Sequence, residues 1–64
     1  MRSKLKVVLA DKEITQTELA DKLGVSQATV WRWTKWEEMR DMSVGRLLEV
    51  AELLGCEVTD LFEE

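Results

Sequence analysis

Residues 15–33, TQTELADKLGVSQATVWRW, constrain the fold more than any other part of this chain. Thr15 and Glu18 have the spacing of a capping box, in which each side chain satisfies an unpaired backbone N–H at a helix start. Gly24 is expected to end this helix, because glycine adopts a positive φ without steric cost. Ser26 is expected to cap a second helix directly afterwards. The pattern therefore predicts a helix-turn-helix, with a turn too short for an antiparallel hairpin.

The apolar residues of this segment are spaced for packing between the two helices. Spacings of three and four residues place side chains on one face of a helix. The second helix is expected to run from Gln27 to about Lys35. The residues expected to face inward, including the one at the corner, are Leu19, Ala20, Leu23, Val25, Val30 and Trp33.

The opposite face of the second helix carries no acidic side chain. Its residues, within an arc of about 140° at 100° per residue, are Gln27, Ala28, Trp31, Arg32 and Lys35. Amide and guanidinium groups match base edges in the major groove of DNA, and an ammonium group suits a phosphate. Gln27 is predicted to pair with adenine and Arg32 with guanine, while Ala28 and Trp31 would contact a thymine methyl group. Lys35 is predicted to contact a phosphate.

The segment resembles the Cro/CI-type (XRE-like) helix-turn-helix repressors. The residues that carry this resemblance are Gln16, Ala20, Gly24, Val25, Val30 and Trp33. Further on, RLLEVAELLGCEVTDLF (residues 46–62) looks like the fourth helix and the start of the fifth helix of that family. The resemblance covers roughly residues 5–62. It implies a lambda repressor-like fold and a repressor of phage or prokaryotic type that reads double-stranded DNA as a homodimer.

Phosphate contacts are expected mainly at the two helix starts. In the resembling family, the glutamine that matches Gln16 commonly contacts a phosphate beside the groove. Free N–H groups and the positive end of a helix attract phosphate oxygens, which supports the same role. Thr17, Ser26 and Thr29 are the further candidates near these starts.

Three aromatic residues near the end of the second helix have different expected roles. Trp33 matches the buried aromatic of the resembling family. An exposed Trp31 would meet DNA, a partner chain, or a neighbouring side chain such as Lys35. Residues 34–42, TKWEEMRDM, lack the glycine and proline that this family has after the helix, so either the helix runs longer or the loop takes another path. Apolar residues that would form either a core edge or a dimer interface are Trp36, Met39 and Met42, with Phe62 as a further interface candidate.

The remaining segments predict three more helices, completing an all-α bundle of about five. A first helix over residues 3–12, capped by Ser3, would turn Leu5, Val8 and Leu9 inward, with Ile14 packing beneath the capping box. Ser43 is expected to cap a helix that runs to Leu54 and is ended by Gly55. Its largely inward residues are Leu47, Leu48, Val50, Ala51 and Leu54. Gly45 is unfavourable in its first turn unless another backbone approaches closely. A last helix is expected over residues 60–63, capped by Thr59.

Length and charge limit the interpretation further. Sixty-four residues allow one domain, residues 1–64, with the helix-turn-helix at residues 16–35. The net charge is −4, which is unusual for a DNA-binding protein. Residues 1–36 carry seven basic and four acidic side chains, a net of +3, and residues 37–64 carry two basic and nine acidic ones, a net of −7. This split would either orient an approach to DNA or merely keep the protein in solution.

Several function classes have no support in the sequence. The chain has no histidine, one cysteine, no glycine-rich phosphate loop and no metal-ligand spacing, so we expect no enzyme activity, metal site, cofactor or small-molecule substrate. The longest apolar run, residues 7–10, is too short to cross a membrane. A single cysteine fits a cytoplasmic protein. The alternative to DNA binding is a protein-interaction module on the same scaffold, favoured by the acidic second half and the three tryptophans.

Overall fold

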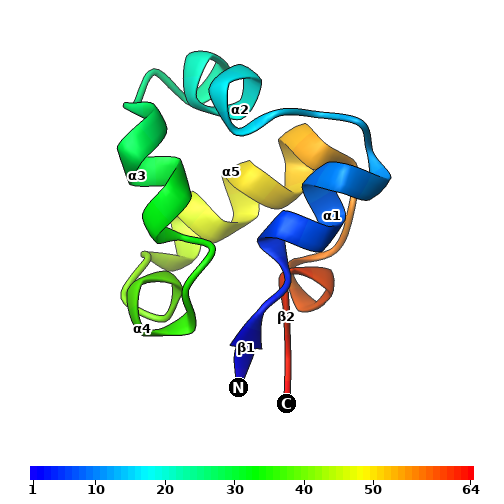
Figure 1. Ribbon diagram of the computed structural model, residues 1–64. Coiled ribbons are helices and arrows are strands. Elements are labelled where there is room, and N and C mark those ends of the chain that lie inside the picture. Colours follow the sequence, from blue (N-terminus) through cyan, green and yellow to red (C-terminus); the bar gives the residue numbers. More distant parts are fainter.

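The computed structural model describes all residues from 1 to 64, and five α-helices make up most of the chain (Figure 1). The α-helices are α1 (Leu5–Asp11), α2 (Gln16–Leu23), α3 (Gln27–Arg32), α4 (Trp36–Met39) and α5 (Val44–Leu54). A 3₁₀-helix, η1 (Val58–Leu61), follows α5, and two short strands, β1 (Arg2–Ser3) and β2 (Phe62–Glu63), lie at the ends of the chain. The predicted all-α bundle of about five short helices is confirmed as a fold class. However, α4 was not predicted, and the strand pair is a further addition.

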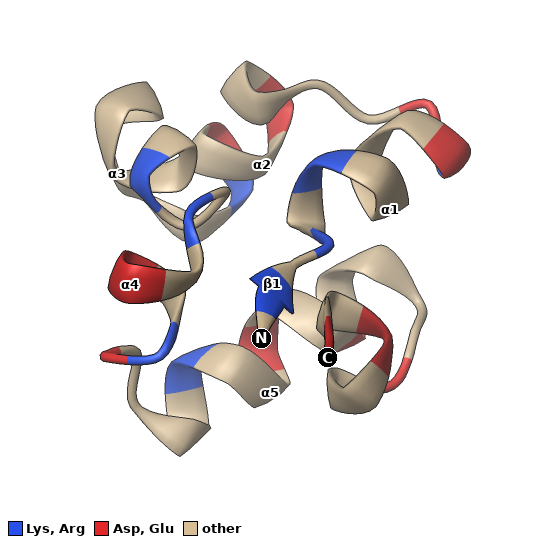
Figure 2. Cartoon of the chain, turned by 60° about the horizontal axis from the view of Figure 1, so that its bottom comes forward, with Lys and Arg blue, Asp and Glu red and all other residues tan.

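The strand pair joins the two ends of the chain. Arg2 pairs with Glu63 and Ser3 with Phe62 in an antiparallel ladder, so both termini lie side by side (Figure 1 and Figure 2). The Arg2 guanidinium also donates to the Glu63 carboxylate at 3.0 Å. Next to the ladder, the Lys4 N–H donates to the Leu61 carbonyl at 2.7 Å. These contacts hold the first residues in an extended conformation rather than a helical one.

The predicted start of the first helix at Ser3 is therefore wrong. Ser3 belongs to β1, α1 begins at Leu5, and Lys4 occupies the N-cap position without a side-chain hydrogen bond. The Ser3 hydroxyl accepts from the Leu5 N–H at 3.3 Å and donates to the Trp33 carbonyl at 2.7 Å. Ser3 thus links the start of α1 to the end of α3.

The caps predicted for α2 and α5 are confirmed. The Glu18 N–H donates to Thr15 Oγ1 at 3.0 Å, and the Thr15 N–H donates to Glu18 Oε1 at 3.1 Å, which completes the capping box. Ser43 Oγ accepts from the Arg46 N–H at 3.1 Å at the start of α5. Gly24 ends α2 with φ of 70° and Gly55 ends α5 with φ of 68°, the left-handed conformation that glycine adopts without strain.

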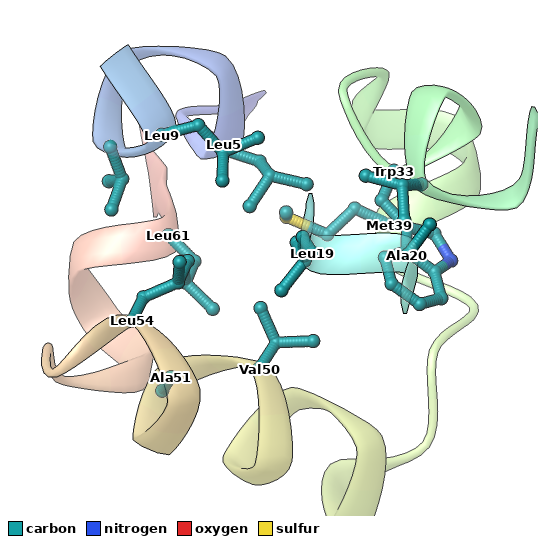
Figure 3. Packing of buried hydrophobic residues seen from close by; sticks show 12 residues of the cluster. Leu5, Leu9, Leu19, Ala20, Trp33, Met39, Val50, Ala51, Leu54 and Leu61 are labelled. Carbon is teal, nitrogen blue, oxygen red and sulfur yellow. The ribbon is translucent and has the colours of Figure 1, made fainter. Parts of the chain in front are cut away.

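A single hydrophobic core lies between the helices, as Figure 3 shows for its side chains. Every α-helix and η1 contributes to it. Its buried residues are Leu5, Val8, Leu9, Leu19, Ala20, Val30, Trp33, Met39, Val50, Ala51, Leu54 and Leu61. Leu48, which was expected to point largely inward, is instead 55% exposed. It lies on the rim of α5, where the neighbouring helices do not cover it.

The end of the chain also differs from the prediction. Instead of a helix over residues 60–63 capped by Thr59, η1 spans Val58–Leu61 and follows Glu57, whose N–H donates to Asp60 Oδ2 at 3.0 Å. Phe62 is extended because it pairs with β1, and its ring packs against Trp36 with centroids 5.7 Å apart. No helix of the chain combines the length and the apolar character that crossing a membrane requires.

Candidate nucleic-acid interface

Helices α2 and α3 form the predicted helix-turn-helix. The turn is fixed by backbone hydrogen bonds, in which the Val25 N–H donates to the Ala20 carbonyl at 3.0 Å and the Gly24 N–H donates to the Asp21 carbonyl at 3.3 Å. Ser26 then caps α3 by accepting from the Thr29 N–H at 3.1 Å. Val30 is fully buried, so the opposite face of α3 must point away from the core. The turn chemistry thus determines which face of α3 is open.

The open face of α3 carries all four residues predicted to read bases. Each of them is exposed, and the helical spacing places them in one arc that faces away from the stripe of Val30 and Trp33: Gln27, Ala28, Trp31 and Arg32. The side chains of Gln27 and Arg32 make no hydrogen bond or ion pair within the chain, so their polar groups are available to a ligand. No carboxylate belongs to this arc.

Helix α3 is shorter than predicted. The N–H groups of Trp33, Thr34 and Lys35 donate to carbonyls only three residues back, each at 3.0 Å, which tightens the last turn. The Thr34 hydroxyl donates to the Trp31 carbonyl at 2.6 Å. As a result α3 ends at Arg32, and Lys35 has an extended backbone (φ −109°, ψ 131°) that precedes α4. Lys35 is therefore not on α3 but just beyond its end.

Lys35 nevertheless lies against the open face of α3. Its Nζ atom is 4.5 Å from the centroid of the Trp31 ring, a cation–π geometry. Trp31 remains 51% exposed, so the lysine covers only part of the indole. Of the three surroundings considered for Trp31, the structure contains the neighbouring side chain, and it leaves indole surface free for a further contact.

The starts of α2 and α3 contain the candidates for phosphate contact. Thr17 and Ser26 are exposed, whereas Gln16 and Thr29 are half-buried. The two hydroxyls of Ser26 and Thr29 lie 2.9 Å apart and hydrogen bond to each other. Only one of the two hydroxyl protons is used in this bond, so the other can be donated to a phosphate oxygen.

Backbone amides at both helix starts are free as well. The N–H groups of Gln16 and Thr17 in α2, and of Gln27 and Ala28 in α3, have no acceptor within the chain. Unpaired amides of this kind carry the positive end of the helix dipole and attract anions. The geometry therefore adds backbone donors to the side-chain candidates.

Both basic and acidic residues lie near the end of α3, although the sequence placed most positive charge in its first half and most negative charge in its second half. Figure 2 shows basic residues on α1 and around the end of α3, but acidic residues on α4, directly after them. Glu37 and Glu38 lie in the first turn of α4, two and three residues after Lys35. A DNA backbone that approached Lys35 would therefore also meet these carboxylates, which repel phosphate.

Two contacts that hold the end of α3 were not predicted. The Ser3 hydroxyl binds the Trp33 carbonyl, and the Arg46 guanidinium stacks on the Trp33 ring with 5.9 Å between its central carbon and the ring centroid. Arg46 also donates to Glu49 at 3.0 Å. Neither contact has a local sequence signal, because its partners come from distant parts of the chain. Both position the helix rather than its reading face.

The predicted dimer candidates lie mostly against the core. Met39 is only 1% exposed, so it has no surface for a partner, and its assignment to an interface is wrong. It is buried because α4 turns toward the core after α3 ends early. Trp36, Met42 and Phe62 are half-buried and pack on the core.

The one cavity lies away from the helix-turn-helix. It has a volume of about 380 Å³, and none of its lining residues belongs to α2 or α3. Cys56 lines it, and burial, together with the charge of Asp60, raises the pKa of this thiol. A thiol that stays protonated is a poor nucleophile. No group of residues in the chain could hold a metal ion.

Comparison with known proteins agrees with this geometry. Residues 4–63 match the family described as the Cro/C1-type HTH DNA-binding domain. A crystal structure described as "a putative DNA-binding protein from Bacteroides fragilis" is 37% identical, superposes with a TM-score of 0.79, and is matched over 94% of each chain. The comparison with curated proteins gave no match. The family is one of DNA-binding domains and not of enzymes. On this basis the chain belongs to the Cro/C1-type helix-turn-helix DNA-binding domain family.

Proposed function

We propose that the protein is a sequence-specific transcriptional regulator, a repressor of phage or prokaryotic type, that reads double-stranded DNA with α3 in the major groove. The observation that carries the proposal is the open, acid-free face of α3. Gln27 would bond adenine N6 and N7, and Arg32 would bond guanine O6 and N7. Ala28 and the free surface of Trp31 would pack on thymine methyl groups.

Phosphate contacts would set the register of α3 in the groove. The free amides at the starts of α2 and α3 support this role, because they point positive charge outward next to the reading face. The assigned side chains are Gln16, Thr17, Ser26, Thr29 and Lys35. Such contacts add affinity for any sequence, whereas the base contacts discriminate between sequences.

The small reading surface supports action as a homodimer. A two-fold dimer would present two α3 helices to half-sites about 34–36 Å apart, one turn of the DNA helix. The dimer is expected to be weak in solution and to be completed on DNA. Of the interface candidates, Trp36, Met42 and Phe62 retain some exposed surface.

The test is a selection from a random duplex library, followed by fluorescence-anisotropy titration of the selected duplex over a range of salt concentrations. The proposal predicts a palindromic sequence whose log affinity falls linearly with log salt concentration, with a slope that reports the phosphates contacted. A scrambled duplex of the same composition is the control. No enrichment of any sequence, even at low salt, would contradict the proposal.

A protein-interaction module is the second candidate. The net charge of −4 and the acidic first turn of α4 favour it, because both oppose a phosphate backbone. In that case the exposed face of Trp31 would bind a protein. Failure of the duplex selection, combined with a folded and stable chain, would favour this candidate.

A further inference from the structure

One face of α5 is apolar and has no partner within the chain. Val44 is 71% exposed and Leu48 is 55% exposed, and the spacing of four residues places their side chains next to each other. Glu52 continues the same line one turn further along, and Gly45 lies beside it. We call these four residues the α5 face. The buried residues of α5, such as Val50 and Leu54, point to another side of the helix.

We propose that a second copy of this chain docks on the α5 face, so that two α5 helices pack antiparallel with Leu48 at the two-fold axis. The inference adds a specific surface to the homodimer of the proposed function, and it rests on that function for its biological role. Val44 and Glu52 are each four residues from Leu48. An antiparallel arrangement centred on Leu48 therefore sets Glu52 of each copy opposite Val44 of the other.

Charge complementarity favours this occupant over an unrelated partner. The N–H groups of Val44 and Gly45 at the start of α5 have no acceptor within the chain, so this end of the helix is positive. The Glu52 carboxylate makes no ion pair within the chain. In the antiparallel pair, each Glu52 lies at the positive helix start of the second copy. The two-fold symmetry repeats this attraction on both sides.

Gly45 gives the arrangement a steric basis. An added Cβ at Gly45 would meet no atom within 4 Å, so nothing in the chain itself requires glycine there. Its φ is not positive either, so the backbone does not require glycine. Without a side chain, this position allows the helix of the second copy to approach closely, which brings the two Leu48 side chains into contact.

The other apolar surface residues do not form a comparable face. Val7 is exposed on α1, where its exposed apolar neighbour one turn away is only the small Ala10. Leu53 is exposed on the opposite side of α5 and has no exposed apolar neighbour one turn away. Trp36, Met42 and Phe62 already pack on the core. The α5 face is therefore the place where two large exposed aliphatic side chains, Val44 and Leu48, are neighbours.

Disulfide trapping tests the arrangement directly and needs no DNA. In a Cys56→Ser background, the Leu48→Cys variant should form a covalent dimer under mild oxidation. A residue at the two-fold axis lies within disulfide-bonding distance of the same residue in the second copy. The matched control is Val7→Cys in the same background. Val7 is also an exposed aliphatic residue in a helix, 61% exposed. Equal trapping at both positions, or none at position 48, would overturn the proposal.

Sedimentation equilibrium gives a second measurement with uncrosslinked protein. Leu48→Gln keeps the helix propensity and the charge, and should weaken dimerisation at least about tenfold, because the contact is lost from both copies. Val7→Gln should leave the dimer constant unchanged, and Glu52→Lys should weaken it. A chain that stays monomeric at high concentration, or a dimer that is insensitive to Leu48→Gln, would contradict the inference.

DNA titrations separate this inference from the proposed function. Leu48→Gln should bind a single half-site as well as the unchanged protein does, but should lose the extra affinity for the palindrome. Loss of binding to both duplexes would contradict the assignment of Leu48 to the dimer surface alone. If neither protein prefers any sequence, the DNA-reading proposal fails while the trapping result still decides the docking surface.

Discussion

Replacing Gly45 with alanine should change the stability of the fold and the strength of dimerisation in opposite directions. The position is helical, its φ is not positive, and an added methyl group meets nothing within 4 Å. Alanine should therefore stabilise the fold by about 0.5–1 kcal/mol, the usual difference from glycine in a helix. For a domain of this size, that gain corresponds to a rise in Tm of about 2–8 °C. If the α5 face binds a second copy, the same methyl group should weaken dimerisation.

The matched control is Gly24→Ala. A Cβ at Gly24 also meets nothing within 4 Å, but φ there is 70°, where an L-residue other than glycine is strained. This substitution should destabilise the fold by about 1–2 kcal/mol. Urea and thermal unfolding followed by far-ultraviolet circular dichroism, at a concentration where the protein is monomeric, would measure both changes. If both variants changed the stability in the same direction, the reasoning would be refuted. An added methyl group has free space at both positions, and the difference between them is the backbone conformation.

Three further predictions concern DNA binding and the helix cap. Arg32→Ala should cost about 1–3 kcal/mol of binding free energy on the selected duplex and relax the base preference in anisotropy titrations. Lys35→Ala should weaken binding to all duplexes alike and lower the slope of log affinity against log salt by about one. Equal effects of both variants on every sequence would contradict the assigned roles. Replacing Glu37 and Glu38 with glutamine removes charges that repel phosphate, so it should raise the affinity for every duplex at low salt. The increase should disappear at high salt, where the charges are screened. Unchanged affinity would mean that α4 is remote from the DNA. Thr15→Ala should destabilise the fold by about 0.5–2 kcal/mol in urea unfolding, because it removes the acceptor of a capping hydrogen bond. The base preference should stay the same, and a changed preference would indicate that Thr15 contacts DNA directly.

Local signals in the sequence predicted the helix boundaries best. Thr15 with Glu18, Ser43 and the two helix-ending glycines act through atoms no more than a few residues away, so the sequence alone specifies their geometry. The inward positions of the helix-turn-helix were predicted for the same reason. Helical spacing fixed Val30 and Trp33 as core residues and thereby defined the open face of α3.

The errors concern contacts between distant segments. The end of α3 at Arg32 depends on a tight last turn and on the Thr34 hydroxyl, and the helical pattern continues smoothly past both. The pairing of Ser3 with Phe62 has no signature in either segment. Leu48 was misassigned because α5 is apolar over a wide arc, and only the placement of the neighbouring helices shows which part of that arc remains uncovered. The roles assigned to the α3 side chains stay predictions.

The pairing of β1 with β2 has a consequence for engineering this chain. Because the first and last residues are adjacent, a flexible linker from the end of one copy to the beginning of the next need only span the distance between the two strand pairs (Figure 1). In such a tandem the second copy is present at an effective concentration in the millimolar range, whatever the total amount of protein. Pairing between the two units then no longer depends on dilution. If two copies pair as proposed, the strand pair is thus a natural place to join them into a single chain.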